Sequence, residues 1–247
     1  MHEKKTLRYL TFGSLYFTQG TILSYFTALN ALYFLDRGLS MTDVGIFASI
    51  ALIPFVIKIF YGILSDQVNL FGLGHRKPYI LLGLLVQGIC LIIAPLIDLT
   101  SHYWTFVVVA FILQMGMALY DTCTDGLAVD TTPPQEEGII QGFMVGGRAL
   151  AVVLTASGVG LLAEFVSWTA VFWMLALITA IPIPLVLLIK EGERTRGEFF
   201  DWSAFAAFNN KTIIALGLLG FLFFFIIQGA NQLVNAFLQT EFQISLS

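Results

Sequence analysis

The stretch YILLGLLVQGICLIIAPLI, residues 79–97, runs for nineteen positions without a charged side chain. A helix needs about 20 mostly apolar residues to cross the hydrocarbon core of a bilayer, so this stretch predicts a transmembrane helix. Six further stretches of this kind predict spans over residues 7–32, 44–64, 104–124, 139–162, 168–189 and 212–236. The sequence lacks the alternating ten-residue segments of a membrane β-barrel. We therefore expect an all-α polytopic membrane protein with seven transmembrane helices.

The composition of the whole chain supports a lipid environment and argues against other classes of protein. Of its 247 residues 57% are apolar and 11% are charged, whereas about 25% of the residues of a soluble domain are charged. A net charge of −4 without a basic stripe argues against a nucleic-acid partner. The two cysteines lie in separate apolar stretches and the three histidines are scattered, so we expect no disulfide and no metal site. Because no nucleophile elbow or phosphate-cradling loop occurs in the sequence, we predict neither an enzyme nor a cofactor.

The basic residues are distributed unevenly over the connecting segments. If the N-terminus lies inside, the inner segments hold nine Lys and Arg residues and the outer segments hold one, Arg37. Cytoplasmic loops carry an excess of Lys and Arg, so we expect a cytoplasmic N-terminus in a bacterial inner (plasma) membrane. The longest inner segment, residues 190–210, carries four aromatic side chains three residues apart, Phe199, Trp202, Phe205 and Phe208. This spacing predicts either an interfacial amphipathic helix or a loop anchored by aromatic side chains.

Apart from Arg8 at the cytoplasmic start of the first span, the charged residues inside the predicted spans are Lys58, Asp121 and Arg148, and Asp125 directly follows the fourth span. Ionisable side chains within a membrane are costly and mark substrate or ion pathways. Asp121 and Asp125 are four residues apart and share one helix face, while Arg148 lies at a similar depth in the following span. We expect Arg148 to pair with one carboxylate and leave the other free to exchange a proton. The alternative is a set of static ion pairs that only fixes helix packing, with Lys58 reaching the second carboxylate.

Amide side chains form a stripe along the last predicted span. They lie at Gln228, Asn231, Gln232, Asn235 and Gln239, on one continuous helix face. The first span carries a weaker counterpart, and one further amide lies near the acids of the fourth span: Tyr16, Gln19, Thr27, Asn30 and Gln114. Such side chains can hold helices together by hydrogen bonds. Their number favours a hydrophilic cavity that binds a polar solute.

The loop between the second and third spans carries a recognisable motif. It reads GILSDQVNLFGLGHRKPY from Gly62 to Tyr79. The positions that match are Gly62, Leu64, Asp66, Gly74, Arg76 and Lys77, and this pattern resembles the loop signature of the major facilitator superfamily. The loop is longer than the commonest form, and Gln67 stands where a basic residue often follows the Asp. The resemblance implies that these residues, with Asp130 at the end of the fourth span, form a cytoplasmic gate.

Two further segments suggest a branch of that superfamily. Pro54 and Lys58 in PFVIK, followed by Asp66, and the segment YDTCTDGLAVD of residues 120–130, followed by Arg148, are similar to the folate–biopterin transporters. They also resemble the related muropeptide permease and acetyl-coenzyme A transporter group. The loop segment SDQVNLFGLGHRKPYILLG resembles, more distantly, carriers associated with bacteriochlorophyll-antenna assembly.

The superfamily resemblance implies a domain organisation. Its members have 12 helices in two six-helix halves that enclose a central solute site. Residues 1–189 would then be the N-terminal half, residues 190–210 the cytoplasmic inter-half loop, and residues 211–247 the start of a C-terminal half. Seven of 12 helices would be present, and we expect the missing part of the C-terminal half in the same chain.

These features together predict a secondary transporter of a polar or anionic organic solute. It would work by alternating access with protons as the driving ion, carried by Asp121 and Asp125, while Lys58 and Arg148 attract the solute or release the acid. The expected partners are the solute, the proton and the lipid bilayer. A seven-helix photoreceptor is disfavoured because the orientation is reversed and the last span lacks a lysine for a Schiff base. A non-transporting membrane assembly factor or a pigment-associated carrier remains the alternative.

Overall fold

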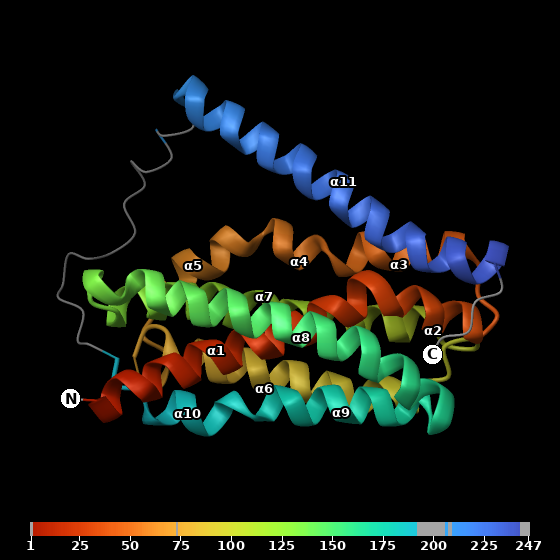
Figure 1. Ribbon diagram of the computed structural model, residues 1–247, viewed down its shortest axis with the longest axis horizontal. Helices are drawn as coiled ribbons and strands as arrows, with labels where there is room; N and C mark the ends of the chain where they lie inside the picture. Colours follow the sequence, from red (N-terminus) through yellow and green to blue (C-terminus); the bar gives the residue numbers. More distant parts are fainter. Residues whose placement is uncertain (1, 73, 192–205, 207–208, 243–247) are drawn as a thin grey trace.

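The computed structural model describes residues 2–72, 74–191, 206 and 209–242, without the side chains of residues 2–4, 28, 71, 228, 231–232, 235–236 and 238–242. These residues form helices and no strand (Figure 1). The main helices are α1 (His2–Ser24), α2 (Asn30–Asp36), α3 (Met41–Ala51), α4 (Ile53–Val56), α5 (Lys58–Gln67), α6 (Lys77–Ile93), α7 (Tyr103–Thr131), α8 (Glu137–Phe165), α9 (Trp168–Ala180), α10 (Pro182–Leu188) and α11 (Lys211–Phe242). Shorter turns are the π-helix η1 (Tyr25–Leu29) and the 3₁₀ turns η2 (Leu70–Gly72), η3 (Ala94–Leu96) and η4 (Pro134–Glu136).

Every predicted span coincides with a helical segment, and three of the segments are interrupted. The first span consists of α1, η1 and α2, and the second consists of α3, α4 and α5. The second span breaks on both sides of α4, at Leu52 and Ile57, around Pro54. A proline inside a helix lacks the N–H of one backbone hydrogen bond and clashes with the preceding carbonyl. The break places Lys58 at the start of a new helix. The sixth span breaks between α9 and α10, where α10 begins at Pro182.

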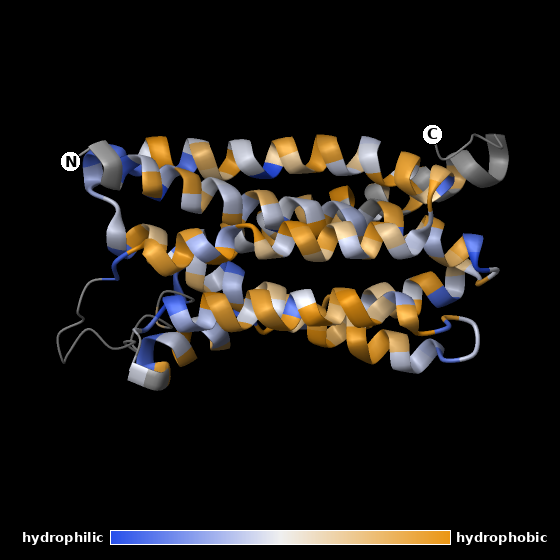
Figure 2. Ribbon diagram, turned by 90° about the horizontal axis from the view of Figure 1, so that it is seen from below, coloured by the Kyte–Doolittle hydropathy of each residue, from blue (hydrophilic) through white to orange (hydrophobic). Residues whose placement is uncertain are grey.

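The length and composition of the helices fit a membrane. Within the described residues five segments are long and apolar enough to cross one: Met41–Gln67, Lys77–Leu96, Tyr103–Thr131, Pro134–Phe165 and Trp168–Leu188. Lys211–Ile227 is a shorter apolar helix. Apolar residues occupy the middle of the bundle and hydrophilic residues collect at its two ends (Figure 2). The predicted all-α polytopic fold is confirmed for this part of the chain.

Glycines allow two helices of the bundle to pack closely. α8 lies along α1, and a methyl group added at Gly147 would meet the carbonyl oxygen of Gly13. A methyl group at Gly20 would lie 2.6 Å from the carbonyl oxygen of Arg148. The main chains of α1 and α8 therefore touch at these positions, which fixes the place of Arg148 relative to α1.

Aromatic side chains fill the end of the bundle that lies away from the N-terminus. Tyr33, Phe34, Phe47, Phe106 and Phe172 are buried and come from α2, α3, α7 and α9. Their rings lie 4.8–6.3 Å apart, mostly edge to face or tilted. Aromatic pairs in such arrangements contribute beyond their buried area, so this end of the bundle is firmly packed.

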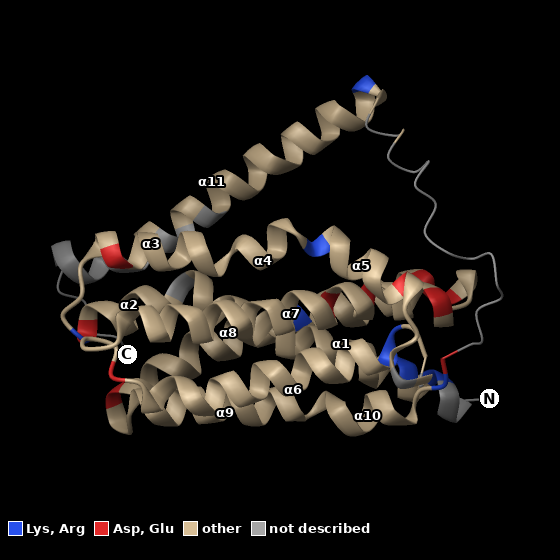
Figure 3. Ribbon diagram, turned by 180° about the vertical axis from the view of Figure 1, so that it is seen from behind, with Lys and Arg blue, Asp and Glu red and all other residues tan. Residues whose placement is uncertain are grey.

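Charge is distributed unevenly between the two ends of the bundle. Lys and Arg are concentrated at the end where the chain begins, and the opposite end carries mainly Asp and Glu (Figure 3). At the N-terminal end Lys5 and Arg8 both form ion pairs with Glu136, which ties α1 to the turn before α8. α11 runs beside the bundle, contacts η1 and α2, and diverges towards the N-terminal end (Figure 1). The interfacial helix predicted around Phe199, Trp202, Phe205 and Phe208 lies outside the described residues.

Candidate functional site

A charge cluster lies in the middle of the bundle, formed by Lys58, Asp121 and Asp125. Lys58 Nζ is 2.5 Å from Asp121 Oδ2 and 3.4 Å from Asp125 Oδ2. The two carboxylates are one helical turn apart on α7, and the helix break before α5 aims the lysine at both. The Asp121 side chain is 4% exposed and that of Asp125 is 45% exposed. Within the described residues Asp125 is therefore the more exposed of the two carboxylates.

α1 supplies a second hydrogen bond to each carboxylate of this mid-bundle charge cluster. Gln19 Nε2 donates to Asp121 Oδ1 at 2.5 Å, and the Tyr16 hydroxyl donates to Asp125 Oδ1. Tyr16 and Gln19 are three residues apart, which places both on one helix face. The sequence predicted them as cavity residues, and the structure brings them to the acids. The cluster therefore joins α1, α5 and α7.

The hypothesis that Arg148 pairs with a carboxylate of α7 is wrong for this structure, because Lys58 occupies that position. α8 packs along α1 and not along α7, so α1 stands between the arginine and the acids. Within the described residues the Arg148 side chain makes no hydrogen bond and no ion pair within 4.0 Å, and it is partly exposed.

The other predicted cavity residues lie farther from the cluster. Gln114 is two helical turns before Asp121 on α7, and Asn30 follows the π-helix of the first span. Both are buried, and their carbonyl oxygens have no hydrogen-bond partner within the described residues. The side-chain carbonyl oxygen of Gln19 is likewise buried without a hydrogen-bond partner within the described residues. The predicted cavity side chains Gln228, Asn231, Gln232 and Asn235 lie outside the described residues, although the backbone of α11 is described.

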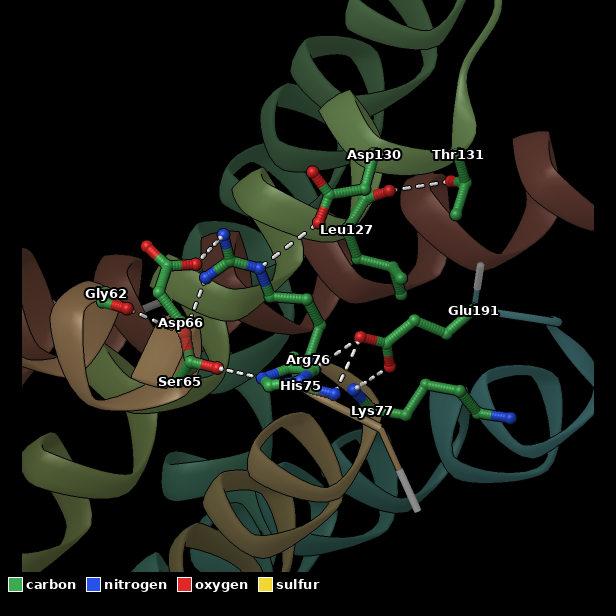
Figure 4. A network of polar contacts seen from close by, with 10 residues as sticks. All are labelled: Gly62, Ser65, Asp66, His75, Arg76, Lys77, Leu127, Asp130, Thr131 and Glu191. Atoms are coloured by element: carbon green, nitrogen blue, oxygen red, sulfur yellow. Dashed lines mark hydrogen bonds and ion pairs between the residues drawn. The ribbon is translucent and has the colours of Figure 1, made fainter. Parts of the chain in front are cut away.

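A second polar network closes the N-terminal end of the bundle around Arg76 (Figure 4). The Arg76 guanidinium lies 2.6 Å from Asp66 Oδ1 and 3.4 Å from Asp130 Oδ2, and it donates to Ser65 Oγ at 2.5 Å. Ser65 Oγ in turn donates to the carbonyl oxygen of Gly62 at 3.0 Å. Arg76 is buried and connects the end of α5 to the end of α7. We call Ser65, Asp66, Arg76, Asp130 and Glu191 the N-terminal charge network.

Glu191 is the member of this network that the sequence did not reveal. Its carboxylate accepts three backbone N–H groups at the start of α6, from His75 and Arg76 at 2.8 Å and from Lys77 at 3.1 Å (Figure 4). The first N–H groups of a helix have no partner inside the helix and attract anions. An acid two residues after Ile189, the last apolar residue of the sixth span, was the available signal.

The predicted gate residues Gly74 and Lys77 complete the same contact. Gly74 has φ +121°, a left-handed conformation that glycine adopts without strain, and a methyl group there would meet the Glu191 carboxylate. Lys77 Nζ donates to the carbonyl oxygens of Leu187 and Ile189 at 3.0 and 2.6 Å. The predicted gate residues therefore lie in one region, where they join α5, α6 and α7 to the end of α10: Gly62, Asp66, Gly74, Arg76, Lys77 and Asp130.

Gly126 is a second feature that the sequence did not reveal. A methyl group at this position of α7 would lie 2.6 Å from Cζ of Arg76. The guanidinium thus lies directly on the main chain of α7. Asp121, Asp125, Gly126 and Asp130 belong to one continuous helix, in which nine residues span about 13 Å. α7 therefore links the mid-bundle charge cluster to the N-terminal charge network.

The long apolar helices and the charges buried between them define a polytopic membrane protein of the helical class. The family model of the Major Facilitator Superfamily matches residues 11–247, and the chain belongs to this superfamily. It is 27% identical over 183 residues to a folate-biopterin transporter of Synechocystis, with 72% of this chain and 36% of that protein covered. The sialic acid transporter NanX of Escherichia coli is 23% identical over 184 residues, with 72% and 42% covered.

A third relative is the probable folate-biopterin transporter 7 of Arabidopsis thaliana. It is 25% identical over 197 residues, with 77% of this chain and 44% of that protein covered. The predicted resemblance to the superfamily and to its folate–biopterin branch is confirmed. The chain spans less than half the length of the curated relatives that it matches.

Proposed function

We propose that this chain is part of a secondary active transporter that moves a polar or anionic organic solute by alternating access, with protons as the driving ion. The superfamily and the transporters among its relatives support transport across a membrane. The observation that supports proton coupling is the mid-bundle charge cluster. In it two carboxylates share one lysine, and of the two only Asp125 has an exposed side chain.

The charge balance of this cluster supports a role for Asp125 in proton exchange. Two carboxylates and one ammonium leave one negative charge, which a single proton neutralises. Asp125 is the half-exposed acid, and its contact with Lys58 is the longer one. Protonation of Asp125 weakens its attraction for Lys58 and changes the acceptor that the Tyr16 hydroxyl uses. In this proposal, the proton loosens α1 from α7 while Asp121 keeps Lys58 in place.

The N-terminal charge network is proposed as the cytoplasmic gate. Its ion pairs connect helix ends, and such contacts can form in one conformation of a transporter and break in another. The concentration of Lys and Arg at this end supports a cytoplasmic N-terminus (Figure 3). In the proposal, the remainder of the C-terminal half supplies the facing wall of the cavity.

Uptake into proteoliposomes by the complete gene product tests this function. Folate, biopterin and N-acetylneuraminate are the solutes to try, since relatives are named for them. An inward proton gradient is expected to accelerate uptake of at least one of them, and Asp125→Asn is expected to abolish that acceleration. The matched control is Asp98→Asn, because Asp98 is a carboxylate in the loop after η3 that bonds only its own neighbours Thr100 and Ser101 in the described chain. Absence of uptake together with co-purification of a pigment or assembly partner would instead indicate an assembly factor.

A further inference from the structure

Arg148 is a charged residue in the middle of a membrane helix whose side chain makes no polar contact within the described residues. It lies eleven residues into α8, about 16 Å along the helix axis, in a stretch that is otherwise apolar. An arginine at this depth is costly. Lys58 makes the ion pairs with both acids of the mid-bundle charge cluster, and within the described residues the arginine makes none with them.

The position of Arg148 is held by its backbone. Gly20 on α1 brings the two main chains so close that a Cβ there would lie 2.6 Å from the Arg148 carbonyl oxygen and 3.0 Å from its Cα. Gln19, the residue before Gly20 on α1, donates a hydrogen bond to Asp121. The backbone of Arg148 is therefore held in place relative to the charge cluster. Its guanidinium makes no hydrogen bond or ion pair within the described residues, and the residue is partly exposed.

We infer that Arg148 binds the anionic oxygen group, a carboxylate or a phosphate, of the transported solute. A guanidinium presents a planar fork of donors that fits two oxygens of such a group and is weakly hydrated. An anionic solute would supply the direct partner that the described residues do not give this guanidinium. This inference rests on the proposed function and narrows its solute to molecules with an anionic group.

The side chain of Gln19 carries a second unpaired polar atom beside the mid-bundle charge cluster. The amide nitrogen of Gln19 faces the Asp121 carboxylate, which fixes the orientation of the amide because a carboxylate only accepts. Within the described residues its side-chain carbonyl oxygen is buried without a donor. A solute with an N–H or O–H donor would reach this oxygen only after the helices around it move apart, as alternating access requires.

The first test is chemical modification of arginine in the complete gene product, followed residue by residue by mass spectrometry. Phenylglyoxal reacts with accessible guanidinium groups, and we expect it to modify Arg148. Folate and N-acetylneuraminate carry carboxylates and are expected to slow this reaction at least about tenfold at saturation, whereas biopterin, which has none, leaves the rate unchanged. Arg37, which is exposed at the opposite end over the Tyr33 ring, serves as the internal control.

The second test uses substitutions and separates this inference from the transport proposal. Arg148→Gln is expected to raise the KM for either carboxylate by about 10- to 100-fold, and Arg148→Lys is expected to recover part of that loss. Protection of Arg148 by a carboxylate without any uptake would keep the anion site and overturn the transport proposal. Uptake of a carboxylate with neither protection of Arg148 nor a change of KM in Arg148→Gln would overturn the anion site alone.

Discussion

Removal of the Lys58 charge is the perturbation whose cost follows most directly from the structure. Lys58→Gln leaves Asp121, whose side chain is 4% exposed, with only the Gln19 hydrogen bond. Breaking a buried ion pair by removing one partner costs about 3–5 kcal/mol. Because the Lys58 side chain is 33% exposed and Gln19 still donates, we expect the lower end of that range, about 3 kcal/mol. The loss corresponds to a fall in Tm of about 6–12 °C for a chain of this size.

A double-mutant cycle distinguishes a lost ion pair from a general loss of packing. In Lys58→Gln/Asp121→Asn no charge is buried without a partner, so the double variant is expected to be about 2 kcal/mol more stable than Lys58→Gln alone. Thermal unfolding followed by tryptophan fluorescence in one detergent measures all four proteins. Lys211→Gln, at an exposed position at the start of α11, is the control and leaves Tm unchanged. A double variant less stable than both single variants would refute the pairing.

Three further substitutions test other contacts of the bundle. Gly20→Ala places a methyl group against the backbone of Arg148 and is expected to cost about 1–3 kcal/mol, whereas Gly142→Ala, which has open space around it, is expected to be neutral or stabilising; equal effects in a thermal-shift assay would contradict the close approach. Glu191→Gln replaces a carboxylate that accepts three backbone N–H groups and is expected to lower stability by about 1–2 kcal/mol, with faster hydrogen exchange at the start of α6; unchanged exchange there would count against the contact. Tyr16→Phe keeps the ring and loses one hydrogen bond to a half-exposed carboxylate, so a loss of about 1 kcal/mol is expected, and a Tm equal to that of the unmodified protein would speak against this bond.

The spans and the N-terminal charge network were accessible to sequence reasoning for physical reasons. An apolar stretch of about 20 residues has few folding options in a bilayer. Asp66 and Arg76 are joined by a short loop, so their proximity depends little on how the helices pack. Asp130 joins them because its helix ends on the same side of the membrane. The contact of Glu191 could not be predicted because its partners are backbone N–H groups at the start of a helix, which the pattern of side chains does not show.

The pairing in the middle of the bundle could not be predicted from depth alone. Counting residues gives the height of Arg148 and Asp121 along their helices, but not which helices are neighbours. The structure places α1 between them, through Gly20 on one side and Gln19 on the other. The break at Ile57 also changes the direction in which the Lys58 side chain points. A continuous helix drawn through the second span would place this side chain in a different direction.

We propose that the mid-bundle charge cluster couples the movement of protons to that of a solute. The proton flux that the solute itself drives tests this coupling directly. The complete gene product is reconstituted in vesicles that contain a pH-sensitive dye, with no gradient imposed, and the transported solute is added outside. We expect acidification of the vesicle interior that depends on the solute and is absent in Asp125→Asn. Solute entry without any change of internal pH, or with the same change in Asp125→Asn, would contradict it.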